Sequence, residues 1–170
     1  METFLIQTKR LNLRPFTVSD AADYFEMVSD NQIKTYINNC PHFWFFHKTV
    51  KKIKDYSTCN FKDNFYLVIE NRSTQQLIGA LLVEKSFDNN FFNVTMMIHK
   101  DHRKNGYMSE SLQAFINFLP SKSRLYFIVF RSNHASVRTI RKIPGIQKEY
   151  SLLRGLDEME SFYLFTYLKP

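Results

Sequence analysis

Apolar and polar residues recur with two different periods along the chain, and each change of period marks an expected element. Alternation over residues 10–16 predicts a half-buried strand. Helical spacing follows over 17–30 and again over 46–57. The aromatic segment 31–46 shows neither period, so we expect an irregular connection there.

A run of strands comes next. Segments 64–71 and 76–86 are apolar and are separated by a polar turn, which predicts a hairpin, and 91–100 is expected to be a third strand. Helical spacing returns over 106–119 and stops at Pro120. The residues expected to face inward from this helix are Leu112, Phe115, Ile116 and Leu119.

The remainder of the chain adds three more strands and a helix. Segment 124–130 is apolar almost throughout, which is typical of a strand buried on both faces. A short helix is expected over 133–143, and strands over 146–153 and 161–169 close the chain. Segments 91–130 form one β-α-β unit, whereas the strands before it form an antiparallel meander.

This order of elements predicts an α+β fold with a mixed, mostly antiparallel sheet and helices packed against it. The chain has 170 residues, which suits one domain over 1–170. Its apolar fraction of 44% is large enough to build a core.

Charge narrows the choice of partners. The net charge is +7, and the segment from Lys100 to Lys142 accounts for all of it. Such a concentration points to an anionic partner, namely a phosphate-bearing cofactor, a nucleic acid or a membrane surface. No helix-turn-helix, zinc or RNA-recognition signature is present, so a nucleic-acid partner is not expected.

Other features favour a reduced, cytoplasmic protein. The chain contains no apolar run long enough to cross a membrane, and its N-terminus does not resemble a secretory signal. We expect no membrane partner. Cys40 and Cys59 lack the spacing of metal ligands, so no metal site and no disulfide are expected.

Gly106 is one of only four glycines, and it lies between the basic stretch HRKN and the start of a predicted helix. The first N–H groups of a helix have no partner within the helix and favour an anion. Every residue over 103–108 can donate an N–H, and Arg103 and Lys104 add charge. This stretch predicts a phosphate-binding loop, and an ordinary basic surface loop is the alternative. The glycine patterns of P-loops and dinucleotide-binding folds are absent.

Three motifs together resemble the GNAT superfamily of N-acetyltransferases, in its RimJ/RimL-like branch. Residues 103–108 are similar to its acetyl-CoA-binding pattern R/Q-x-x-G-x-G/A, with Met108 at the last position. Residues 8–14 resemble the opening T-x-R-L-x-L-R strand. The segment beginning at residue 133 resembles N-x-x-S-x-R-x-x-x-K-x-G, although Pro144 stands where the glycine usually lies.

The resemblance implies a central sheet of about six or seven strands, about four helices and a monomeric or homodimeric protein. It also implies acetyl-CoA as co-substrate and direct transfer of its acetyl group to a primary amine, either a protein N-terminus or a small molecule. The residues that it places around the cofactor are Met97, Ile98, His99, Arg103, Lys104, Asn105, Gly106, Tyr107, Met108, Asn133 and Ser136.

The catalytic residues are less well matched. Ser136 could hydrogen-bond the departing sulfur, and Asn133 could hold the pantetheine chain or cap its helix. Ile140 occupies the position of a tyrosine acid that is common in the superfamily, and Asn93 that of a strand carboxylate.

Glu84 is the first candidate for the general base, ahead of Glu149 and Glu158. His99 and His102 flank the predicted loop and could titrate near neutrality. The aromatic residues 42–46 could form the mouth for the acceptor or pack in the core. A catalytically silent acyl-CoA-binding module is the alternative function.

Overall fold

The structure describes most of the chain. A computed structural model of the protein describes residues 4–170 apart from 38–43, 60, 62, 87–90 and 150–161.

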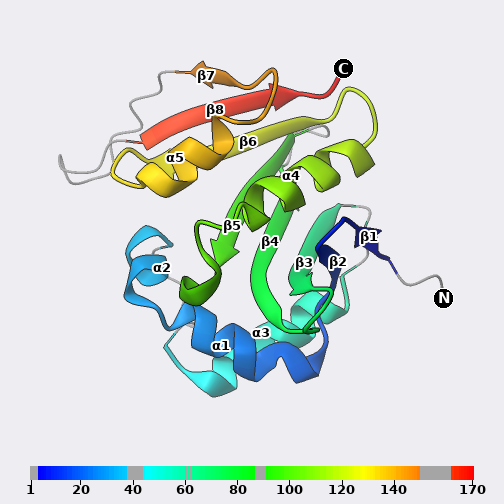
Figure 1. Cartoon of the computed structure of the whole chain (residues 1–170), viewed down its shortest axis with the longest axis vertical. Helices are drawn as coiled ribbons and strands as arrows, with labels where there is room; N and C mark the ends of the chain where they lie inside the picture. Colours follow the sequence, from blue (N-terminus) through cyan, green and yellow to red (C-terminus); the bar gives the residue numbers. More distant parts are fainter. Residues whose placement is uncertain (1–3, 38–43, 60, 62, 87–90, 150–161) are drawn as a thin grey trace.

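Eight strands in this part of the chain form one sheet, in the order β1-β2-β3-β4-β5-β6-β8-β7 (Figure 1). All neighbouring strands are antiparallel except β5 and β6, which are parallel. The mixed, mostly antiparallel sheet predicted from the sequence is therefore confirmed. The strands are β1 (Ile6–Gln7), β2 (Leu11–Pro15), β3 (Asn64–Asn71), β4 (Leu77–Lys85), β5 (Phe91–Ile98), β6 (Arg124–Phe130), β7 (Gln147–Glu149) and β8 (Phe162–Leu168).

Helices cover both faces of this sheet. The α-helices in the described residues are α1 (Ala21–Val28), α2 (Asn31–Tyr36), α3 (Phe46–Ser57), α4 (Tyr107–Phe118) and α5 (His134–Ile140). Two short 3-10 helices, η1 (Val18–Asp20) and η3 (Lys100–His102), precede α1 and α4.

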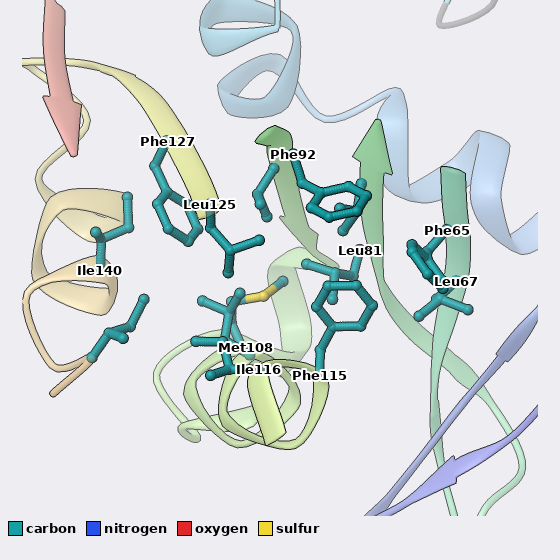
Figure 2. Close-up of a cluster of buried hydrophobic side chains, with 14 of the residues drawn as sticks. Phe65, Leu67, Leu81, Phe92, Met108, Phe115, Ile116, Leu125, Phe127 and Ile140 are labelled. Atoms are coloured by element: carbon teal, nitrogen blue, oxygen red, sulfur yellow. The ribbon is translucent and has the colours of Figure 1, made fainter. Parts of the chain in front are cut away.

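Two apolar clusters hold the layers together. The larger one packs the inward face of α4 against the sheet, and Figure 2 shows Met108, Phe115 and Ile116 pointing toward Leu81 and Leu125. The second cluster lies on the opposite face. It joins α1 and α3 to β3 and β4 through side chains that include Tyr24, Ile53, Val68, Ala80 and Leu82.

Some sequence predictions are wrong in detail. The segment expected to be irregular contains helix α2, which Asp30 caps by accepting hydrogen bonds from the backbone N–H groups of Gln32 and Ile33. Strand β1 was not expected either. The predicted strand over 146–153 is described only as β7, because its last residues lie outside the described part.

Strand β6 differs most clearly from its prediction, because it is buried on one face only. Leu125, Phe127 and Val129 point into the larger cluster, whereas Ile128 is 51% exposed. The reason is that the cluster on the opposite face of the sheet, which α1 and α3 cover, includes no side chain of β6. The pairing of β6 with β5 is also short. Strands β5 and β6 pair only between 91–93 and 124–126, and both strands continue beyond these residues. Their carboxyl ends therefore flank an opening in the sheet.

Candidate functional site

A cavity of about 630 Å³ lies between the diverging carboxyl ends of β5 and β6. Its walls are the second halves of β5 and β6, helix α2, the loop before α4 with the first turn of that helix, and α5 with Lys142 after it. A volume of this size is typical of sites for small molecules and cofactors. The separation of the two parallel strands thus creates a candidate ligand site.

The start of α4 presents a row of free backbone donors to this cavity. The N–H groups from Lys104 through Ser109 have no acceptor among the described residues, and the first donor used by the helix is that of Glu110, which bonds to the Gly106 carbonyl at 3.1 Å. Gly106 caps the helix without a side-chain hydrogen bond. Orphan donors at a helix start attract anions, so this loop suits a phosphate group.

The backbone of the loop explains why a glycine is used. Gly106 has φ 78° and ψ 4°, in the left-handed region that L side chains adopt at a cost. Lys104 also has a positive φ, of 65°. A glycine at this position would adopt the same angle without strain.

Contacts from the turn between β1 and β2 hold the first turn of α4. Glu110 accepts hydrogen bonds from the Thr8 hydroxyl and from the Arg10 backbone and side chain, with an Arg10 Nη2 to Glu110 Oε2 distance of 2.7 Å. The Arg10 guanidinium also stacks over the Tyr107 ring at 4.5 Å. Partial burial by itself would raise the pKa of Glu110, but these donors lower it below its usual value.

Arg103 reaches away from the loop. Its Nε donates to the Ile98 carbonyl at 3.1 Å, and its Nη1 donates to Gln32 Oε1 at 2.6 Å. Its Nη2 lies 3.3 Å from Asp30 Oδ2. Lys104 and His102, by contrast, line the cavity without an ion pair among the described residues.

The loop after β6 supplies the second wall. Asn133 caps α5, because its side-chain oxygen accepts the Ser136 N–H at 3.2 Å, as expected for an N-cap. Asn133 and Ser136 both line the cavity. Arg138 and Lys142 add positive charge on the same side.

The end of β5 supplies the third wall. The His99 N–H bonds to the Ile78 carbonyl of β4 at 2.9 Å. Because successive N–H groups of a strand point to opposite sides, the Ile98 N–H points toward the opening beside β6. Gly79 makes this arrangement possible, since a Cβ atom there would lie 2.6 Å from the Met97 carbonyl oxygen.

Most of the residues predicted to bind the cofactor come together around the cavity. Its lining includes Met97, Ile98, Arg103, Lys104, Gly106, Tyr107, Met108, Asn133 and Ser136. His99 and Asn105 are not part of that lining. The His99 ring lies near Asp101 and Glu26, and the Asn105 side chain donates to the carbonyls of His102 and Arg103.

The candidate bases lie elsewhere. Glu84 is exposed and accepts a hydrogen bond from the Tyr66 hydroxyl at 3.0 Å, outside the cavity lining. Burial, together with the Glu84 charge, raises the pKa of Tyr66, so Tyr66 is a hydrogen-bond donor at neutral pH. Glu149 ends β7, and Glu158 lies outside the described residues.

The aromatic segment gives a mixed result. Residues 42 and 43 lie outside the described part, whereas Trp44, Phe45 and Phe46 are exposed, so core packing is wrong for these three side chains. They do not line the cavity either. Trp44 lies under the ammonium group of Lys34, on α2, at 4.3 Å.

Sequence reasoning missed the contribution of α2. This helix lines the cavity with Gln32, Ile33 and Tyr36, although its segment was expected to be irregular. The signal was present in Asp30 as an N-cap followed by apolar residues three and four positions apart.

Two kinds of feature are absent from the described residues. No helix among them is long and apolar enough to cross a membrane. No cluster of histidine, cysteine or acidic side chains in that part could hold a metal ion, and Cys59 is a free thiol. Cys40 lies outside the described residues.

The class of the protein follows from comparison with known families. Residues 10–144 match the family described as acetyltransferase (GNAT) domain. The chain belongs to this family of acetyltransferases, so the family resemblance found in its motifs is confirmed.

Particular relatives agree with this assignment. The chain is 26% identical to the uncharacterized N-acetyltransferase YnaD of Bacillus subtilis over 147 residues, which cover 85% of this chain and 83% of YnaD. Its fold matches that of RimL, a ribosomal L7/L12 alpha-N-protein acetyltransferase solved with coenzyme A, with a TM-score of 0.82, 15% identity and 98% of each chain covered. It also matches MccE, a microcin C7 self-immunity acetyltransferase solved with acetyl-CoA and AMP, with a TM-score of 0.78, 12% identity, and 95% and 93% covered.

Proposed function

We propose that the protein transfers an acetyl group from acetyl-CoA to a primary amine, by direct attack within a ternary complex. The observation that carries the proposal is the row of backbone N–H groups from Lys104 through Ser109. They have no acceptor among the described residues, and all of these residues except Asn105 line the cavity. Membership of the GNAT family supports it. Further support comes from RimL and MccE, whose structures hold coenzyme A and acetyl-CoA.

The chain's own groups fit this co-substrate. The loop from Lys104 to Ser109 would hold the pyrophosphate through its backbone N–H groups, and the Lys104 side chain would add charge. The Nδ2 group of Asn133 has no acceptor among the described residues and would bond the pantetheine chain. Acetyl-CoA supplies the activated acetyl thioester.

The end of β5 would stabilise charge on the reacting carbonyl. The Ile98 N–H points toward the cavity and would donate to the thioester oxygen as negative charge develops there. The neutral amine nitrogen forms a bond to the carbonyl carbon, and the carbon–sulfur bond breaks. Ser136 would hydrogen-bond the departing thiolate from the first turn of α5.

The proton of the amine needs a separate route. No aspartate or glutamate lines the cavity in the described part of the chain. Glu84 stays a candidate base. Because it pairs with Asn93 at the start of β5 and lies outside the lining, it would act through a chain of water molecules. We propose that the acceptor, a protein N-terminal amine or a small amine, enters from the side on which α2 lies, because the starts of α4 and α5 would hold the cofactor.

One observation favours a silent acyl-CoA-binding module as a second candidate. Ile140 stands at the usual position of the tyrosine acid and is fully buried, so this position supplies no proton donor. Both the acetyltransferase and the silent module would bind the cofactor, but only the acetyltransferase would acetylate an amine.

Calorimetry with acetyl-CoA, followed by an assay of thiol release with a panel of N-terminal peptides and small amines, tests the proposal. We expect micromolar binding and amine-dependent thiol release. Ser136→Ala should lower the turnover number about tenfold or more while leaving acetyl-CoA affinity nearly unchanged. No binding at millimolar acetyl-CoA would exclude both functions, and binding without turnover of any amine would leave the silent module.

A further inference from the structure

Helix α2 bridges the two sides of the opening in the sheet. Figure 1 shows it near the carboxyl end of β5, between α1 and α5. Its first residues contact Arg103 in the loop before α4, and its last residue, Tyr36, contacts the end of β6. The helix therefore touches both walls that would hold the cofactor.

All three nitrogens of the planar Arg103 guanidinium, called its fork below, make contacts near the start of α2. One nitrogen holds the Ile98 carbonyl at 3.1 Å, and the other two hold Gln32 at 2.6 Å and Asp30 at 3.3 Å. The Arg103 side chain is 27% exposed and that of Asp30 only 14%. A partly buried arginine with its donors divided between a strand end and a helix is poorly placed to turn toward a phosphate.

Asp30 connects this fork to the helix itself. Its Oδ1 atom accepts the N–H groups of Gln32 and Ile33, at 2.6 and 3.3 Å, and so caps α2. Its Oδ2 atom faces Arg103. Burial by itself would raise the pKa of Asp30, but the Gln32 N–H and the Arg103 charge lower it, so the carboxylate is charged at neutral pH.

The other end of α2 is also fixed. The Tyr36 hydroxyl donates to the Ser132 carbonyl at 3.2 Å, and its ring lies 5.9 Å from that of Phe130. Tyr36 and Phe130 both line the cavity. Contacts at both ends hold α2 as a wall on the side from which the acceptor would enter.

We propose that Arg103 is a positioning residue that ties the cofactor loop to α2 and so places the acceptor-side wall, rather than a ligand of the cofactor phosphates. Its neighbour Lys104 lines the cavity without an ion pair in the described residues and takes the phosphate role. The inference rests on the proposed function. It assigns opposite roles to two adjacent cations, and these roles can be separated by experiment.

Three variants separate the roles. Arg103→Met removes the fork, and Asp30→Asn removes the charge of its partner but keeps a good N-cap, since asparagine caps helices as well as aspartate. Lys104→Met removes the adjacent cation and is the matched contrast. Each variant is measured for its acetyl-CoA dissociation constant by calorimetry and for kcat and KM with the most active amine of the panel.

We expect Arg103→Met and Asp30→Asn each to raise the acceptor KM about fivefold, and to change the acetyl-CoA dissociation constant by less than about twofold. The double variant should be no worse than either single one, because both remove one contact. Lys104→Met should do the reverse, raising the acetyl-CoA dissociation constant about fivefold and sparing the acceptor KM. A purely structural defect would lower thermal stability without this split.

Two results would overturn the inference. One is a rise of about tenfold in the acetyl-CoA dissociation constant of Arg103→Met while Asp30→Asn behaves like wild type, since this would make Arg103 a phosphate ligand. The other is full additivity of the two substitutions, which would show that the side chains do not act together.

The inference can also be tested without turnover. Trp44 is the only tryptophan of the chain and lies under Lys34 of α2, so its emission reports on the placement of this helix. Arg103→Met and Asp30→Asn should shift this emission alike, whereas Lys104→Met should not. An unchanged spectrum in both variants would contradict the inference. Failure of wild-type protein to bind acetyl-CoA would instead count against the proposed function.

Discussion

Two residues of the loop before α4 have positive φ angles, and only one of them is a glycine. Gly106 suits its angle of 78°, whereas Lys104 adopts 65° at a cost. A lysine kept in this conformation supplies charge at the edge of the cavity that a glycine could not. The positive φ angle of Gly106 thus explains why one of the few glycines of the chain lies in this basic loop.

Substitution of Gly106 tests the role of its backbone angle. A Cβ atom there would lie 3.7 Å from Arg10 Nη2, an ordinary contact, so the cost of alanine comes from the φ angle. We expect Gly106→Ala to lower the free energy of unfolding by about 1 kcal/mol and Gly106→Asn by about half as much, since asparagine tolerates this region. Urea denaturation measures both. Lys104→Gly is the matched control and should not lower stability, and equal losses for alanine and asparagine would contradict the argument.

Single residues were predicted well where their role depends on local chemistry. The N-cap at Asn133 and the free donors before α4 follow from residue type and position alone. The partners of Arg103 could not be predicted, because Gln32 lies 71 positions earlier and the sequence does not report such contacts. The sequence analysis therefore assigned Arg103 to the cofactor phosphates because of its positive charge.

At the scale of elements, the first turn of α4 is held by the turn between β1 and β2, the two strands at the sheet edge. Thr8 and Arg10 donate to Glu110, so the start of α4 is fixed before any ligand arrives. This arrangement favours a preorganised loop. It also makes the position of the loop sensitive to the charge of one carboxylate.

Low pH should therefore weaken the contacts of Glu110 with Thr8 and Arg10. The pKa of Glu110 is lower in the folded than in the unfolded protein, where it is about 4.3, so its stabilising effect is complete above that pH. The effect is lost as pH falls through the folded pKa. We expect Glu110→Gln to be less stable than wild type by about 1 kcal/mol at pH 7, with the difference shrinking below about pH 4. Denaturation between pH 3 and about 7 measures this, and a difference independent of pH would contradict it.

Elements with strong periodicity were predicted correctly, and weak ones were not. The helix with Leu112, Phe115, Ile116 and Leu119 inward has all four of these side chains buried. Helix α2 was missed because it is short, mostly polar and held by contacts at its two ends. The exposed side of β6 was missed because an apolar run cannot show that the cluster on one face of the sheet stops short of this strand.

At the scale of the whole molecule, the site exists because two parallel strands separate. The elements that line the cavity contribute different groups. Helix α4 offers backbone donors, Asn133 and Ser136 lie at the start of α5, and α2 closes the side on which we propose that the acceptor enters. The GNAT fold was predictable from three motifs and the element order. The cavity itself was not, since it depends on pairing that stops after residues 91–93.

Amide chemical shifts of the labelled protein, recorded by NMR during titration with coenzyme A, test the central claim most directly. The account predicts that the largest shifts fall on the backbone N–H groups of Lys104 through Ser109, with smaller shifts at Asn133 and Ser136. Titration with inorganic sulfate controls for a general response to anions. Saturable binding of coenzyme A that leaves the amides from Lys104 through Ser109 unshifted would contradict the account.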